Sequence, residues 1–300
     1  MKSVRFTRFG DPDVLEIVEL PDPHPGPGEV RIAVRAAGVN ASDWKKRAGL
    51  MDRELPQTLG YEAAGVVDEV GDGVTGAAVG DRVVGLSGHG GAQAELAVLS
   101  DWTALPASVG FAEAAALPTA LETAARGLDR LGVAGGSLLL VNGASGSVGS
   151  VAVQLAVARG ARVIGTASPA GHAYLRTLGA EPVAYGENLV RDVRALAPDG
   201  VDRALDVAGS GVLPELIDLA GGPGHVVTLA DFAGAHEHQV TFSRGDGGRA
   251  LHVLDDLGDL IAGGRLALPR VHTFPLGDVV EAHRTGEAGR ATGKLVLINC

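Results

Sequence analysis

Three glycines spaced three residues apart form the stretch whose chemical meaning is easiest to state. Gly143, Gly146 and Gly149 lie in VNGASGSVG, after the aliphatic run SLLLV and before SVAVQLAVARG, which has the pattern of a helix. A turn between a strand and a helix exposes bare backbone and the free N–H groups of the helix N-terminus. Such a turn suits a phosphate, and a tight turn without a ligand is the alternative.

The spacing of this loop matches a dinucleotide fingerprint. Ala144-x-Gly146-x-x-Gly149 overlays Gly-x-Gly-x-x-Gly, with alanine in the first position. Gly146 would let a pyrophosphate approach the main chain, and Gly149 would let the helix pack on the strand. We therefore expect the cofactor to contact Ala144, Ser145, Gly146, Ser147, Val148 and Gly149.

The end of the next expected strand indicates which dinucleotide binds. An NAD site places an acid about 20 residues after the glycines, where it binds the ribose 2′-hydroxyl. No acid occurs between Arg162 and Ala180, and an acid would repel a 2′-phosphate. Ser168, His172 and Tyr185 could donate hydrogen bonds there, although Ser168 could instead be a helix N-cap and His172 a solvated surface residue. The sequence therefore favours NADPH.

The elements that must hold this loop alternate along the middle of the chain. A helix broken at Pro118 opens the region 111–245, and strands then alternate with helices from SLLLVN to HVVTLA, which predicts a doubly wound parallel sheet. Residues 1–110 are short β-type runs between turn clusters, which favours an antiparallel, barrel-like domain. Residues 246–300 begin with one long expected helix, GGRALHVLDDLGDLIAGG, and end with strand KLVLIN.

Composition excludes several classes of function. The 300 residues carry a net charge of −11, which argues against nucleic acid and anionic lipid as partners. No apolar run is long enough to span a membrane, and the start lacks an apolar signal core, so we expect a cytoplasmic protein. The single cysteine, Cys300, forms no internal disulfide and excludes a cysteine-rich zinc site.

Stretches in order along nearly the whole chain resemble one family, the zinc-independent quinone oxidoreductases of the medium-chain dehydrogenase/reductase superfamily. The resemblance rests on AAGVNASDWKKRAGL, LPQTLGYEAAGVVDEVGDGV, AVGDRVVGL, GGAQAELAVL, AAALPTALETAARGL, VNGASGSVG, DVAGS and GKLVLIN. It implies an α/β chain with a GroES-like β-barrel substrate domain at 1–110, a Rossmann NADP-binding domain at 111–245 and a return to the substrate domain at 246–300. It also implies an active site in the cleft between the domains, and a homodimer.

Zinc-dependent relatives have a His before the Glu of the GxE stretch and a catalytic Cys upstream. Here Tyr61 precedes Glu62, and Asn40 and Ala41 occupy the cysteine region, so we expect no metal. By resemblance, Asn40 lies near the nicotinamide ribose and Thr123 lies under the nicotinamide ring. The resemblance places four further residues near the cofactor at the ends of strands, namely Ala208, Gly209, Leu229 and Ala230.

Hydride transfer without zinc suits an acceptor that is already activated, such as a quinone or a conjugated enone. The candidate catalytic residues are Tyr61, Lys45 and Asn40, with Tyr61 or Lys45 as proton donor. Several relatives have tyrosine in place of Lys45 and lysine in place of His172, so the proton donor and the strength of 2′-phosphate binding stay open. The alternatives are a non-catalytic NADPH-binding protein and an enoyl-thioester reductase.

Overall fold

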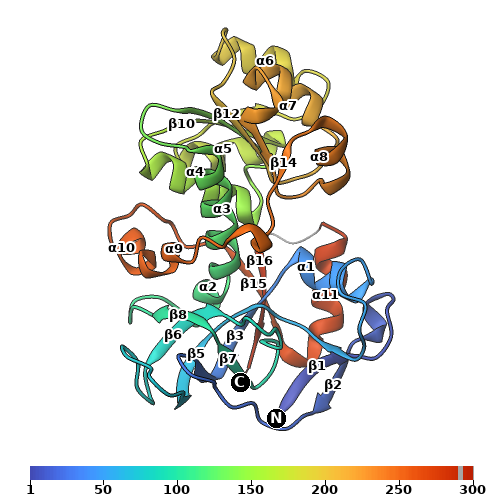
Figure 1. The fold of residues 1–300 in the computed structure, drawn as a ribbon, viewed down its shortest axis with the longest axis vertical. Coiled ribbons are helices and arrows are strands. Elements are labelled where there is room, and N and C mark those ends of the chain that lie inside the picture. Colours follow the sequence, from blue (N-terminus) through green and yellow to red (C-terminus); the bar gives the residue numbers. More distant parts are fainter. Residues whose placement is uncertain (290–292, 300) are drawn as a thin grey trace. The chain divides into compact units, whose positions relative to one another are not determined.

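The computed structural model describes residues 1–289 and 293–299, which form two compact units. Unit 1 contains Met1–Thr119, Leu254–Gly258 and Leu268–Cys300, and unit 2 contains Ala120–Val253 and Asp259–Ala267 (Figure 1). Unit 1 therefore extends beyond the expected boundary at residue 110. The reason is that helix α2 (Phe111–Ala115) packs on strands of unit 1.

Unit 2 is built on a six-stranded parallel sheet in the order β11-β10-β9-β12-β13-β14. The order reverses beside β9, which creates the switch point of a doubly wound sheet and confirms the predicted fold class. The strands are β9 (Leu138–Asn142), β10 (Arg162–Ala167), β11 (Glu181–Ala184), β12 (Arg203–Asp206), β13 (Val226–Thr228) and β14 (Thr241–Phe242).

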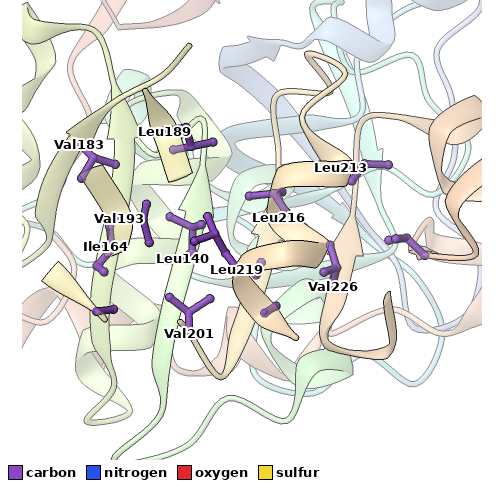
Figure 2. Close-up of a cluster of buried hydrophobic side chains, with 14 residues drawn as sticks. Leu140, Ile164, Val183, Leu189, Val193, Val201, Leu213, Leu216, Leu219 and Val226 are labelled. Atoms are coloured by element: carbon purple, nitrogen blue, oxygen red, sulfur yellow. The ribbon is translucent and has the colours of Figure 1, made fainter. Parts of the chain in front are cut away.

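Helices connect these strands, and their apolar faces build the core. Their bounds are α3 (Pro118–Leu131), α4 (Ser147–Ala158), α5 (His172–Thr177), α6 (Leu189–Leu196), α7 (Leu213–Ala220) and α8 (Phe232–His238). In α6, Leu189 and Val193 are one turn apart and buried, and they pack with Leu140 of β9 and Leu216 of α7 (Figure 2). Each fully buried aliphatic side chain of this kind contributes about 1.5–3 kcal/mol.

Unit 1 contains a seven-stranded sheet and a smaller three-stranded sheet. The larger sheet runs β15-β16-β3-β5-β6-β8, with β7 paired to β3, and the smaller runs β2-β1-β4. All pairs are antiparallel except β15–β16, as expected for the GroES-like domain. The strands are β1 (Lys2–Phe6), β2 (Glu16–Glu19), β3 (Val30–Val39), β4 (Gln57–Thr58), β5 (Glu62–Val70), β6 (Arg82–Leu86), β7 (Leu96–Leu99), β8 (Asp101–Ala104), β15 (Val271–Pro275) and β16 (Lys294–Ile298).

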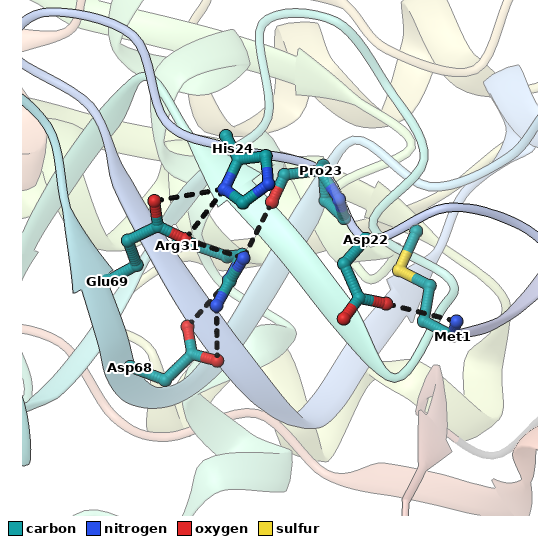
Figure 3. A network of polar contacts seen from close by, with 7 residues as sticks. All are labelled: Met1, Asp22, Pro23, His24, Arg31, Asp68 and Glu69. Carbon is teal, nitrogen blue, oxygen red and sulfur yellow. Dashed lines mark hydrogen bonds and ion pairs between the residues drawn. The ribbon is translucent and has the colours of Figure 1, made fainter.

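An ion-pair network lies at the start of β3. The Arg31 guanidinium donates to Asp68 at 2.9 Å, and another of its nitrogens is 2.6 Å from Glu69 (Figure 3). The Pro23 carbonyl also accepts from Arg31, and the His24 ring is 3.0 Å from Glu69. This network joins the start of β3 to the end of β5. It lies at the opposite end of these strands from Asn40, which follows β3, and Glu62, which begins β5.

One expected helix needs correction, and two further helices were not expected. The long helix expected from residue 246 is two short helices, α9 (His252–Asp255) and α10 (Leu257–Ala262). Consecutive aspartates and Gly258 have low helix propensity, which explains the break at Asp256. Helix α8 and helix α1 (Ala41–Arg47) were not expected from the sequence. None of the helices in the described part of the chain has the length and apolar character needed to cross a membrane.

Candidate functional site

The glycine loop, Gly143–Gly149, follows β9 and leads into α4, and its three glycines have different structural roles. Gly143 has φ +82°, and Gly146 is the N-cap of α4 with φ −75°. A Cβ at Gly146 would meet only the Gly143 carbonyl oxygen, at 3.4 Å, whereas a Cβ at Gly149 would lie 2.2 Å from that oxygen. Gly149 therefore allows α4 to pack against the loop, and Gly146 leaves open space in front of the helix N-terminus.

A chain of buried polar side chains joins the ends of four neighbouring strands of unit 2. Thr166 donates to the Asn142 side-chain oxygen at 2.8 Å, and the Asn142 amide donates to Asp206 at 2.9 Å. Thr228 donates to the other Asp206 oxygen at 2.7 Å. We call these four residues the buried polar chain, and each is at most 2% exposed.

The buried polar chain also holds the loops that follow the strands. Thr166 Oγ1 accepts from the Gly143 N–H at 2.9 Å, and Asp206 accepts from the N–H groups of Ala208 and Gly209 at 3.1 and 3.0 Å. Thr228 Oγ1 accepts from the Ala230 N–H at 3.2 Å. The structure thus brings the glycine loop, Ala208, Gly209 and Ala230 to one edge of the sheet, where doubly wound proteins bind ligands.

Two other expected cofactor residues lie on or against α3. The Leu229 side chain is directed toward Gly127, since a Cβ at Gly127 would lie 3.5 Å from Leu229 Cδ1. Thr123 is partly exposed on the same helix, and its hydroxyl donates to Glu122 at 3.4 Å.

The residues expected at a 2′-phosphate gather beside the glycine loop. Ser168 and Tyr185 directly follow Ala167 and Ala184, which pair between β10 and β11. A Cβ at Gly171 would lie 3.4 Å from Ser145 Cβ, so the segment containing Ser168 and His172 lies against the glycine loop. The Ser168 hydroxyl makes no capping hydrogen bond, and Nε2 of His172 is buried without a partner in the described residues.

The strand registers of unit 1 bring three distant residues together. Leu295 pairs with Val39, so Lys294 lies across from Asn40, and Ala63 pairs with Ala37, so Glu62 lies across from Gly38. The Lys294 ammonium donates to Glu62 Oε1 at 2.7 Å and to the Asn40 side-chain oxygen. The Asn40 amide donates to the same Glu62 oxygen at 2.8 Å, which closes a triangle of polar groups.

The two candidate proton donors, Tyr61 and Lys45, have different surroundings. Tyr61 precedes Glu62 and is partly buried, and burial, followed by the charges of Asp43 and Asp52, raises its pKa to about 12. Lys45 is exposed and is not brought to Tyr61. Its neighbour Lys46 does lie near Tyr61, with its ammonium 5.5 Å from the Tyr61 ring centroid. The same ammonium donates a hydrogen bond to the Thr58 carbonyl at 3.2 Å. Burial lowers the pKa of Lys46.

The Asp43 carboxyl group holds the backbone next to this site. Its carboxyl group is fully buried and accepts from the N–H groups of Asn40 and Gly60, at 2.7 and 3.0 Å. Burial raises the pKa of Asp43 to about 6, against the opposing effects of those two N–H groups and of Lys294. Asp43 therefore fixes the backbone at Asn40 and at Gly60.

The raised pKa of Asp43 predicts a specific pH dependence of stability. The folded state binds this proton more tightly than the unfolded state, so the contribution is complete below pH about 4 and is lost as pH rises through about 6. The difference from the ordinary value of 3.8 corresponds to about 3 kcal/mol. In urea unfolding, Asp43→Asn should therefore gain stability relative to the wild type, by up to that amount, between pH about 4 and 7. A pH-independent difference would contradict the assignment.

Sequence reasoning missed Glu62 as a functional residue, together with Lys294 and the buried polar chain. A usable signal was present, because Glu62 and Lys294 are opposite charges that each begin an otherwise apolar strand, EAAGVV and KLVLI. Buried charges are almost always paired, so each implies a partner. In residues 1–289 and 293–299, no three His, Cys, Asp or Glu side chains gather in a way that would hold a metal ion.

Comparisons with known proteins agree with this architecture. Residues 26–121 match the alcohol dehydrogenase GroES-like domain, and residues 178–297 match the family described as zinc-binding dehydrogenase. The chain is 35% identical to a quinone oxidoreductase of Pseudomonas aeruginosa, over 99% of both proteins. It is also 35% identical to the 2-methylene-furan-3-one reductase of Solanum lycopersicum, over 99% of this chain and 79% of that protein.

A solved structure extends the similarity to three dimensions. The quinone oxidoreductase of Escherichia coli complexed with NADPH superimposes with a TM-score of 0.88 at 27% identity, and the alignment covers both chains completely. Together with the two family models, these similarities show that the chain belongs to the quinone oxidoreductases of the medium-chain dehydrogenase/reductase superfamily.

Proposed function

We propose that the protein is a reductase that uses NADPH to reduce quinones or activated enones without zinc. The observation that carries the proposal is the open space at Gly146, in front of the N-terminus of α4 and beside the loops held by the buried polar chain. Free N–H groups and the positive end of the helix dipole favour an anion there. The quinone oxidoreductase relatives and the NADPH-bound Escherichia coli enzyme support the same reading.

The residues present fit NADPH. The backbone of Ala144–Gly149 would hold the pyrophosphate, because Gly146 has no side chain to block it. Ser168 has a hydroxyl that caps no helix, and His172 has a buried nitrogen without a partner among the described residues. Their segment lies against Ser145, and residues 162–180 contain no acid, so we assign the 2′-phosphate to Ser168, His172 and the exposed Tyr185.

A single hydroxyl tests this assignment. Ser168→Ala should weaken NADPH binding about tenfold, or about 1.4 kcal/mol, and leave NADH binding nearly unchanged, since NADH lacks the 2′-phosphate. Calorimetry with both nucleotides measures this, with the exposed Ser108→Ala as control. Equal wild-type affinity for NADPH and NADH would contradict the preference.

The reaction needs little from the protein beyond position and one hydrogen bond. NADPH, when bound, supplies the hydride. An acceptor that becomes a delocalised hydroquinone or enolate anion does not need a Lewis acid, whereas a simple alcohol must first lose a proton, which zinc promotes in other enzymes. Because its pKa is raised to about 12, Tyr61 stays protonated at neutral pH and can donate to the developing oxyanion.

Removing the Tyr61 hydroxyl should slow the chemical step. No described residue accepts a hydrogen bond from this hydroxyl, so it is available to the substrate. Tyr61→Phe should lower kcat with quinones by about 10²-fold and leave the Kd for NADPH unchanged. Tyr174→Phe removes a hydroxyl from α5 as a control. A fully active Tyr61→Phe enzyme would show that the proton comes from elsewhere, with Lys46 the next group to replace.

A further inference from the structure

The triangle of Asn40, Glu62 and Lys294 contains two buried charges and one partly exposed amide. Glu62 is 0% exposed and Lys294 is 5% exposed. Asn40 is the only member with substantial exposure, so a ligand can meet this cluster only through the Asn40 amide. We propose that Lys294 and Glu62 are positioning residues, which fix the Asn40 side chain for the nicotinamide half of NADPH. This inference rests on the proposed function.

The donor and acceptor chemistry of the three groups permits one orientation of the amide. An ammonium only donates and a carboxylate only accepts. The Asn40 oxygen must therefore face Lys294, and its nitrogen must face Glu62, 2.8 Å away. A half-turn of the amide would place its N–H groups against the ammonium and its oxygen against the carboxylate, so both contacts would become repulsive.

The fixed orientation leaves a defined set of groups for a ligand. One Asn40 N–H is used by Glu62, and one lone pair of the oxygen is used by Lys294. The Asp43 N–H is also directed at the Asn40 side chain in the capping box that begins α1, so one Asn40 N–H is the group left for a ligand. That N–H can donate to the oxygen of a ribose hydroxyl.

Glu62 is itself held in place by several contacts, so that it can fix the orientation of the Asn40 amide. Its second oxygen accepts from the Thr119 N–H at 2.8 Å. Its first oxygen fills the space left by Gly38, where a Cβ would lie 2.2 Å away. The Asn40 backbone is separately fixed by its N–H bond to Asp43 at 2.7 Å. Backbone and side chain of Asn40 are thus both set before any ligand binds.

A double-mutant cycle on NADPH affinity tests the inference. Lys294→Met should raise the Kd for NADPH at least about fivefold, to the value seen with Asn40→Ala, and the two changes together should raise it no further. Because Lys294→Met leaves the Glu62 charge buried alone, Glu62→Gln/Lys294→Met provides a charge-neutral second variant with the same expected loss. Affinity for 2′,5′-ADP, which lacks the nicotinamide half, should stay at the wild-type value in every variant.

Matched variants separate positioning from general damage. Arg31→Met removes the ion pair at the other end of β3 and should leave both affinities unchanged. Lys294→Arg, which can donate to both partners, should recover NADPH affinity. Equal loss of 2′,5′-ADP affinity, or losses that multiply in the combined variant, would overturn the inference, as would an Asn40→Ala protein with normal affinity. If the wild type binds 2′,5′-ADP and NADPH equally poorly, the proposed function fails as well.

Discussion

Gly146→Val is expected to abolish NADPH binding, with a loss of at least about 100-fold in affinity, while the protein stays folded. The valine side chain would project into the open space in front of α4, where the pyrophosphate must approach the backbone. The backbone of Gly146, at φ −75° and ψ 175°, accepts a valine, so we expect stability to fall by no more than about 1 kcal/mol. Calorimetry with NADPH and urea unfolding measure the two effects separately.

Gly149 provides the matched control three residues away. Gly149→Ala places a Cβ 2.2 Å from the Gly143 carbonyl oxygen and 2.8 Å from Ala144 Cα, so backbone must move. We expect this variant to lose about 1–3 kcal/mol or more of unfolding free energy. Gly146→Val with wild-type affinity for NADPH would show that the phosphate binds elsewhere, and an unfolded Gly146→Val would show that the space is not open.

Asp206→Ala is expected to cause a large loss of stability in unit 2. Asp206 is fully buried and accepts hydrogen bonds from the Asn142 amide, the Thr228 hydroxyl and two backbone N–H groups. Each buried group left without a partner costs about 1–3 kcal/mol, so we expect a loss of about 4 kcal/mol or more. The glycine loop should also loosen, because Asn142 and Thr166 connect it to Asp206.

Asp206→Asn distinguishes hydrogen bonding from side-chain volume. The amide keeps one accepting oxygen but turns an NH₂ group toward Thr228, whose oxygen already accepts from Ala230 and Asp231. We expect this variant to lose about half as much free energy in urea unfolding as Asp206→Ala. A loss below about 1 kcal/mol for Asp206→Ala would show that the buried polar chain does not hold this edge of the sheet.

Features encoded over short stretches of sequence were the most predictable. The alternation of strands and helices from residue 111 predicted the doubly wound sheet, and the turn-separated runs before it predicted an antiparallel, barrel-like domain. Both follow from local hydrophobic periods. The GroES-like type of that domain came from the family resemblance. The loop Ala144–Gly149 is also local, since six consecutive residues contain the whole pattern. Tyr61 was found because it directly precedes Glu62 in a recognisable stretch.

Features that depend on pairing between distant strands were not predictable. Lys294 meets Asn40 across 254 residues, and only the register of β16 against β3 places them opposite each other. The position of Lys46, rather than Lys45, near the Tyr61 ring was not predictable for a related reason. The two differ by one position on α1, an element that the sequence pattern did not reveal, and one position rotates a helical side chain by about 100°.

We propose that the protein reduces quinones or enones with NADPH and without metal. The most direct test is NADPH consumption by chelator-treated protein with 9,10-phenanthrenequinone and 1,2-naphthoquinone, compared with NADP⁺ reduction by primary alcohols. We predict quinone-dependent NADPH consumption that survives chelation and no useful alcohol oxidation. A protein that ignores every quinone and enone but oxidises primary alcohols, and loses that activity on chelation, would contradict the account.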